Sequence, residues 1–381
     1  MSADRPILKS LTFPAAVVAA VALSLVFPAA LGVWFGRDLK FLIVPLVQVI
    51  TFGMGTTLCP KDFKRILLVP WPVVVGFVLQ FSIMPLVGFA IATLLGFEPE
   101  IAAGVILIGS VSGGVASNLI NFLAGNNVAL SVTMTALTTL GAPIMTPFWM
   151  KTLAGKLVPV DFVEMMFSII DMIIVPIIAG LVANRILYSG KPWTRSAGRL
   201  AAIGVLGAAA AIALIPVEMG FLGPLATLKR GLVLGLFLIA LVALAKLILE
   251  NVLKHGGRWM DKALPLVSMA GICLIIAIIT SRASALLLHS GLLLVVAAMI
   301  HNATGYTLGY FGARAFGLNK IDARTVSVEV GMQNGGMASG IAMDVLKSAG
   351  AALAPAIFGP WMNVSGSILA AYWRRKPVAK L

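Results

Sequence analysis

The chain has 381 residues, of which 60% are hydrophobic and only 11% are charged, with a formal net charge of +14. Soluble domains carry about 25% charged residues, so this composition excludes a soluble enzyme or binding module. In a soluble chain the positive charge would indicate nucleic-acid binding. Here most Lys and Arg lie in short loops between apolar stretches, which is typical of membrane topology.

Apolar stretches close to the roughly 20 residues that a spanning helix needs recur along the whole chain. The first also fits a secretory signal peptide, because Arg5 and Lys9 precede it. Its length favours a retained span, and without it the first half would have one helix fewer than the second. The sequence therefore predicts an all-α polytopic membrane protein with about 12 spans, at 11–32, 38–58, 69–95, 100–124, 128–150, 160–187, 198–219, 230–253, 264–284, 287–313, 322–348 and 350–373.

The loop cations predict the orientation of these spans. If the N-terminus lies in the cytoplasm, 19 Lys and Arg fall in cytoplasmic loops and tails and 8 fall outside. The positive-inside rule then predicts that both termini are cytoplasmic, and we expect a multi-pass protein of a bacterial inner membrane. Lys246 lies inside the span at 230–253, and we expect its side chain to reach the cytoplasmic surface.

Two polar, glycine-bearing stretches interrupt otherwise apolar helices, at 109–118 and 329–336. Each lies in the fourth helix of a set of five. Because five is an odd number, the second set enters the membrane in the opposite sense. Broken helices at matching positions of two inverted repeats are the best sequence indication of a transporter binding site. We predict a first repeat at 1–156, the first helix of the second repeat at 157–190, an inserted helical hairpin at 191–258, and the remaining four helices at 259–381. The hairpin is expected to be a peripheral packing or oligomer-contact element.

Glu329 is the most informative single residue. An ionisable side chain inside a span is costly and usually faces a cavity or a partner. Glu329 lies four residues before Gln333, with no Lys or Arg between Arg324 and Lys347. Carboxylate, amide and carbonyl oxygens are the ligands of hard cations, so we interpret this acid as a cation ligand. A purely structural buried acid is the alternative.

The first half supplies matching oxygens. Ser117 and Asn118 follow the first break, and Ser131 and Thr135 share one face of the next span. Small hydroxyls in membrane helices often bond only to their own backbone, but four polar side chains beside a break favour a cation site. Gln80 is a lone amide in the apolar run 73–95 and needs partners. Asp171 lies in the apolar stretch 167–181, where we expect an interfacial or pairing role or, alternatively, a gating or proton role.

Each break also creates a helix N-terminus, near Gly114 and near Gly335. Unpaired N–H groups and the positive end of the helix dipole attract anions there. Glycine pairs allow the backbone to approach a bound molecule closely. A cation held by Glu329 next to two such N-termini predicts a cation-coupled site for a small organic anion.

At these motifs the chain resembles the bile acid:sodium symporter family. The resemblance is carried by Ser112-Gly113-Gly114-Val115-Ala116-Ser117-Asn118, by 125–135, by Val328-Glu329-Val330-Gly331-Met332-Gln333-Asn334, by 301–306 and by 361–367. It covers nearly the whole chain except roughly 190–258. It implies panel and core domains with two crossing broken helices, and two sodium sites. The first would use Ser117, Asn118, Ser131, Thr135 and Glu329, and the second Gln80, Glu329, Gln333 and the backbone of Val330 and Met332.

The chain departs from the family pattern where a substrate would bind. Ser112 stands where the family commonly has proline, Val115 where it has threonine, and Met362 where it has histidine. Val115 removes a hydroxyl and makes the expected pocket more apolar. The expected substrate-binding residues are Ser112, Gly113, Gly114, Val115, Asn334, Gly335 and Asn363.

We therefore predict a sodium-coupled symporter of a small organic anion that works by alternating access. Proton coupling is an alternative, and so is a passive channel or ligand sensor on the same fold. An intramembrane serine protease is disfavoured, because its Gly-x-Ser-Gly motif would need glycine where Ser110 stands. We expect no enzyme activity, no cofactor other than sodium as coupling ion, and no nucleic-acid partner. The expected partners are a carboxylate substrate, sodium and membrane lipid, whereas the sequence leaves the oligomeric state and the identity of the anion open.

Overall fold

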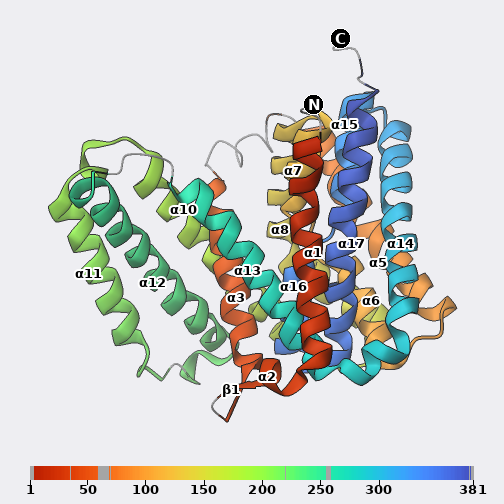
Figure 1. Ribbon diagram of the computed structural model, residues 1–381, viewed down its shortest axis with the longest axis horizontal. Coiled ribbons are helices and arrows are strands. Elements are labelled where there is room, and N and C mark those ends of the chain that lie inside the picture. Colours follow the sequence, from red (N-terminus) through yellow and green to blue (C-terminus); the bar gives the residue numbers. More distant parts are fainter. Residues whose placement is uncertain are drawn as a thin grey trace. The chain divides into compact units, whose positions relative to one another are not determined.

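The computed structural model describes residues 4–34, 36–58, 68, 70–218, 220–254, 259–376 and 378. The described chain is almost entirely helical (Figure 1). Its α-helices are α1 (Asp4–Val26), α2 (Pro28–Gly32), α3 (Ile43–Thr57), α5 (Pro70–Leu94), α6 (Pro99–Ser110), α7 (Ala116–Ala124), α8 (Val128–Trp149), α9 (Phe162–Ile169), α10 (Val175–Tyr188), α11 (Ala197–Leu214), α12 (Lys229–Lys246), α13 (Trp259–Arg282), α14 (Ser284–Ala315), α15 (Lys320–Gly331), α16 (Gly335–Asp344) and α17 (Ala349–Arg374).

Short irregular helices and one hairpin complete the list. The 3₁₀ turns are η1 (Leu39–Leu42), η4 (Pro192–Thr194) and η5 (Gly220–Leu228), and the π-helical turns are η2 (Met150–Ala154), η3 (Ile170–Ile174) and η6 (Leu247–Val252). Strands β1 (Val33–Trp34) and β2 (Arg37–Asp38) pair antiparallel, with Val33 opposite Asp38.

Every predicted span coincides with a helix or with consecutive helices of the structure. Within the described residues, seven helices are long and apolar enough to cross a membrane. They confirm an all-α membrane protein with several spans. The stretches predicted at 100–124 and 322–348 are each divided into two short helices, α6 and α7, and α15 and α16. Both interruptions therefore lie where the glycine-bearing polar motifs predicted them.

The chain forms two compact units. The large unit comprises Met1–Phe41, Lys61–Met165 and Cys273–Leu381, and the small unit comprises Leu42–Pro60 and Met166–Ile272. Both broken helices belong to the large unit. The helices at 197–214 and 229–246, which the sequence predicted as an inserted hairpin, belong to the small unit.

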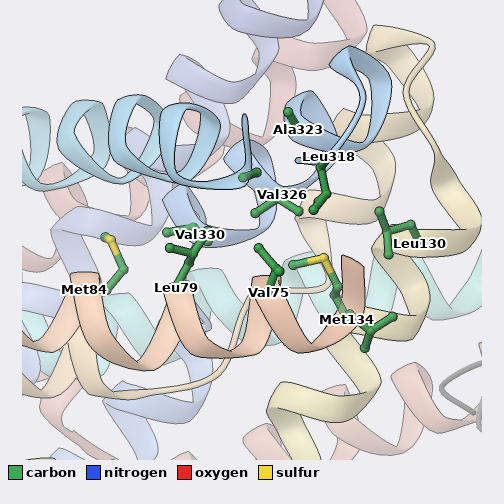
Figure 2. Packing of buried hydrophobic residues seen from close by; sticks show 11 residues of the cluster. Val75, Leu79, Met84, Leu130, Met134, Leu318, Ala323, Val326 and Val330 are labelled. Carbon is green, nitrogen blue, oxygen red and sulfur yellow. The ribbon is translucent and has the colours of Figure 1, made fainter. Parts of the chain in front are cut away.

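In the large unit, α6 packs closely against α5 and α17, and α15 packs against α14, α5 and α8. A Cβ atom at Gly104 of α6 would lie 2.1 Å from the carbonyl oxygen of Ala351 in α17, so this approach requires glycine. An apolar cluster joins α15 to α5 and α8 (Figure 2). Its residues include Val326, Val330, Leu79 and Met134. This packing fixes α15, the helix that carries Glu329, on one of its sides.

In the small unit, α10 lies beside α3 and α12, and α11 lies beside α12 (Figure 1). Asp171, in the π-helical turn before α10, is fully buried and accepts hydrogen bonds from the Gly231 N–H (2.6 Å) and the Gln48 amide (3.2 Å). It also pairs with Arg230, with its Oδ2 atom 3.3 Å from the Arg230 Nε atom. The carboxylate thus lies at the N-terminus of α12, where a helix dipole favours negative charge. The pairing role predicted for Asp171 is confirmed.

Lys246 differs from the prediction. The residue is only 4% exposed, and its ammonium group donates to the carbonyl oxygens of Ile186 (2.7 Å) and Leu187 (3.0 Å). These carbonyls lie in the last turn of α10, where free acceptors and the negative end of the dipole attract a cation. Lys246 therefore binds the end of a neighbouring helix instead of extending to the surface. Together with Asp171, which lies in η3 directly before α10, it fixes both ends of α12.

Candidate functional site

The two broken helices meet at their breaks. α6 ends at Ser110 and α7 begins at Ala116, while α15 ends at Gly331 and α16 begins at Gly335. Residues Gly113 and Gln333 pair as an antiparallel bridge. The Gly114 N–H donates to the Met332 carbonyl (2.8 Å), and the Asn334 N–H donates to the Ser112 carbonyl (2.9 Å). Each break thus satisfies backbone groups freed in the other, as buried non-helical backbone within a membrane requires.

Glu329 lies one turn before the second break and is 3% exposed. Its Oε1 atom accepts hydrogen bonds from the hydroxyls of Ser117 (2.6 Å) and Ser131, and from the Asn121 amide at 3.4 Å. Its Oε2 atom accepts one from the Thr135 hydroxyl (2.8 Å). The described partners of this buried carboxylate are therefore hydroxyls and an amide, which carry no charge that could neutralise it.

Side chains of α7 and α8 surround Glu329, and all but Asn121 were predicted from the sequence. Ser117 and Asn121 come from α7, and Ser131 and Thr135 come from α8. Asn118 is linked to Glu329 through Ser131, since its Oδ1 atom accepts a hydrogen bond from the Ser131 hydroxyl at 2.7 Å. All five predicted residues of the first sodium site are thus in one hydrogen-bonded cluster.

A second cluster surrounds Gln80 of α5, which is 1% exposed. The Gln80 amide donates to the Val111 carbonyl in the first break (3.0 Å) and to the Gln333 side-chain oxygen in the second. The Gln333 amide donates in turn to the Val330 carbonyl (2.6 Å). Within the described residues, the buried Oε1 atom of Gln80 has no hydrogen-bond partner. The structure therefore brings Gln80, Val330 and Gln333 together, next to both breaks.

The residues expected to bind substrate lie around the same crossing, with different exposure. Val115 is 38% exposed, and Asn334, Gly335 and Asn363 are partly exposed. Gly113 and Gly114 are buried. Ser112 is also fully buried, and its hydroxyl points to the Met337 sulfur at 3.7 Å. Of these seven residues, the four with exposed surface are therefore the ones that can contact a molecule at the crossing. They are Val115, Asn334, Gly335 and Asn363.

Comparison with known proteins identifies the family. A family model described as the sodium bile acid symporter family matches residues 44–222. A sodium-dependent transporter of Bacillus subtilis, YocS, itself uncharacterised, is 33% identical over 365 residues, which cover 96% of this chain and 91% of the relative. The chain belongs to the sodium bile acid symporter family.

Two plant proteins also align over most of the chain. The probable chloroplastic sodium/metabolite cotransporter BASS1 of Arabidopsis thaliana is 27% identical over 335 residues, covering 88% of this chain and 67% of the relative. BASS2 of rice, also named a probable chloroplastic sodium/metabolite cotransporter, is 31% identical over 324 residues, covering 85% of this chain and 62% of the relative. The family resemblance inferred from the sequence is confirmed.

The sequence did not predict the contacts of three side chains that shape the site of this family member. Asn121 follows Ser117 by one helical turn, and that spacing could have placed it on the Glu329 face. Asn302 of α14 donates to the Gly331 carbonyl (2.7 Å) at the end of α15. The Met362 sulfur accepts the Gln333 N–H at 3.0 Å. No local pattern indicates the last two partners, because they lie about 30 residues away from the break in the chain.

Proposed function

We propose that this protein is a sodium-coupled symporter of a small organic anion that works by alternating access with two sodium sites. The observation that carries the proposal is Glu329, buried in the large unit among neutral oxygen-bearing side chains. A buried carboxylate without a cationic partner is costly, and a bound alkali cation would neutralise it. The oxygens of Ser117, Asn118, Ser131 and Thr135 can bind such a cation. A hydroxyl oxygen keeps its lone pairs when it donates a hydrogen bond, and the amide oxygen of Asn118 is an acceptor.

A second sodium ion fits the cluster around Gln80. A buried acceptor atom without a donor carries a desolvation cost that a cation relieves. The Gln80 Oε1 atom lies next to the break, where the carbonyls of Val330 and Met332 and the Gln333 side chain supply further oxygens. We propose that Glu329 contributes to this site as well as to the first.

The substrate is proposed to bind at the crossing, between the N-termini of α7 and α16. Val115 precedes α7 without a side-chain cap, and Asn334 caps α16 by accepting the Met337 N–H at 3.0 Å. Two helix N-termini that face one region favour a carboxylate. Val115, Asn334, Gly335 and Asn363 would contact the molecule, while Ser112, Gly113 and Gly114 form the backbone behind them. Sodium would raise the substrate affinity, and substrate would raise the sodium affinity by the same factor.

We also propose two inverted repeats, one at 1–156 and one formed by 157–190 and 259–381, whose broken helices both lie in the large unit. Gln80 donates to the Val111 carbonyl, and Asn302, which is 222 residues later, donates to the Gly331 carbonyl, which is 220 residues later. α6, α7 and α8 correspond to α15, α16 and α17 at nearly the same offset. This correspondence supports alternating access by repeats of opposite orientation in a bacterial inner membrane. The first turn of α1 and the last turn of α17 lie at the same end of the large unit in Figure 1, which supports two cytoplasmic termini.

The proposed coupling is tested by thermal stability of the purified protein in sodium or potassium, with and without a panel of small carboxylates. We expect sodium alone to raise the melting temperature relative to potassium, because a ligand that binds only the folded state stabilises it. At least one carboxylate should add to this effect in sodium and have no effect in potassium. Equal melting temperatures in both cations, with no response to any carboxylate, would contradict coupling and favour a channel or sensor.

The second sodium site predicts a specific effect of Gln80→Leu. Leucine has a similar size but supplies no oxygen, so the concentration of sodium that gives half-maximal uptake should rise about 10-fold, the equivalent of about 1.4 kcal/mol. The measurement is uptake into proteoliposomes as a function of external sodium. Gln80→Glu, which keeps the side-chain oxygen and replaces the amide nitrogen by a second oxygen, is the matched control and should retain high sodium affinity. If uptake by Gln80→Leu depends on the sodium concentration as in the wild type, Gln80 is not a sodium ligand.

A further inference from the structure

α15 has two adjacent faces of opposite character. Asp322, Thr325 and Glu329 are spaced by three and four residues and therefore share one face. The neighbouring face carries Ala323, Val326 and Val330, which belong to the apolar cluster shown in Figure 2. α8 is divided in the same way, because Ser131 and Thr135 contact Glu329, whereas Leu130 and Met134 belong to the apolar cluster. Polar groups thus continue from Glu329 along one face of α15, directly beside its apolar face.

Hydrogen bonds link this polar face from Glu329 to the start of α15. The Asn121 amide contacts both the Glu329 carboxylate (3.4 Å) and the Thr325 carbonyl (3.5 Å). The Thr325 hydroxyl accepts the Asn127 N–H at 3.0 Å, and the Asn127 amide donates to the Asp322 carboxylate at 2.8 Å. The Asn126 amide also donates a hydrogen bond to the Asn121 side-chain oxygen at 2.9 Å. An unbroken row of side chains with oxygen atoms therefore joins the two acids.

Burial decreases along this row. Glu329 is 3% exposed and Thr325 is fully buried, whereas Asn127 and Asp322 are partly exposed. Asp322 precedes Glu329 by seven positions of α-helix, a distance of about 10 Å along the axis. Within this distance, a hard cation that loses its water would meet oxygen atoms at each turn of the helix. The apolar face offers it none.

We propose that this row is the route by which sodium passes between Glu329 and one surface of the large unit, with Asp322 as the cation ligand at its mouth. The route opens where α7 ends and α8 and α15 begin, which is the cytoplasmic side in the orientation predicted from the loop charges. The inference rests on the proposed sodium coupling. It adds an exit path and an acidic residue that neither sodium site contains.

The other broken helix provides a matched comparison. Glu100 lies in the first turn of α6 and accepts a hydrogen bond from Ser348 at 2.5 Å, and Ser348 caps α17. Asp322 lies in the first turn of α15 and binds Asn127, which caps α8. Both acids thus accept a hydrogen bond from a residue that caps a neighbouring helix, and Asp322 also accepts one from the Asn319 amide at 2.6 Å. Behind Glu100, however, the same face of α6 continues with Ala103 and Leu107, so it supplies no side-chain oxygens.

The test compares Asp322→Asn with Glu100→Gln in proteoliposomes loaded with radioactive sodium. Asp322→Asn should slow sodium exchange about 10-fold, as expected for an added barrier of about 1.4 kcal/mol. The sodium concentration for half-maximal thermal stabilisation should stay unchanged, because the Glu329 site is intact. Glu100→Gln should leave the exchange rate unchanged. Asp322→Glu should restore the rate.

Thr325→Val gives a second, shape-conserving test within the row, and it should also slow exchange at unchanged sodium affinity. Equal rates in wild type and Asp322→Asn, or equal slowing in Asp322→Asn and Glu100→Gln, would overturn the route. If Asp322→Asn does not fold, a normal rate of sodium exchange in Thr325→Val is sufficient to overturn the proposed route. Absence of any sodium exchange or stabilisation in the wild type would instead refute the proposed coupling itself.

Discussion

Glu329→Gln is expected to reduce sodium-driven uptake by at least about 100-fold. Glutamine has nearly the same shape, so the packing around α15 stays the same, but the negative charge that would attract sodium is lost. Removing one partner of a buried charge pair costs about 3–5 kcal/mol, which corresponds to a factor of more than about 100 in affinity. The hydroxyls of Ser117, Ser131 and Thr135 surround this carboxylate, and none can replace its charge.

This prediction is measured as uptake into proteoliposomes with an inward sodium gradient, alongside the melting temperature in sodium and in potassium. The variant should insert and purify normally, and its melting temperature should no longer depend on sodium. Glu100→Gln makes the same chemical change at an acid outside the cluster and should behave as wild type. Full sodium-driven uptake by Glu329→Gln would contradict sodium coupling through Glu329. Uptake by the wild type that is driven by a proton gradient would show that protons are the coupling ion.

The positions of both breaks could be predicted because their cause is local. Glycine pairs and polar residues inside apolar stretches remove helix propensity, and α6 and α15 end within or beside the predicted motifs. The side-chain cluster around Glu329 was predictable for a related reason. Ser131 and Thr135 are four residues apart on a regular helix, so their common face follows from helix geometry alone.

Pairings between distant segments could not be predicted from such patterns. Nothing near Asn302 in the sequence indicates that its amide binds the Gly331 carbonyl, and nothing near Met362 indicates a contact with Gln333. Lys246 was placed wrongly for the same reason. A lone lysine in an apolar helix usually extends to the membrane surface, but here the free carbonyls at the end of α10 lie within its reach.

Gly114→Ala is expected to disturb the crossing of the two broken helices directly. A Cβ atom at this position would lie 2.7 Å from the Gln333 carbonyl oxygen and 3.2 Å from its carbon. Both are backbone atoms of the other break, so relief requires the two breaks to move apart. That movement would lengthen the bonds from Gly114 to Met332 (2.8 Å) and from Asn334 to Ser112 (2.9 Å). Overpacking of this kind costs about 1–3 kcal/mol.

We expect Gly114→Ala to lower the melting temperature and to reduce sodium-driven uptake more than about 10-fold, since the Gln80 and Glu329 clusters both depend on the crossing. Gly336→Ala is the matched control. Its Cβ atom would meet only the Asn334 side-chain oxygen, at an ordinary 3.7 Å, and alanine is the better helix former by about 1 kcal/mol. The control should therefore be as active as wild type and at least as stable. Equal activity of both variants would show that the sodium sites tolerate separation of the breaks, and the reciprocal hydrogen bonds would then be dispensable for coupling.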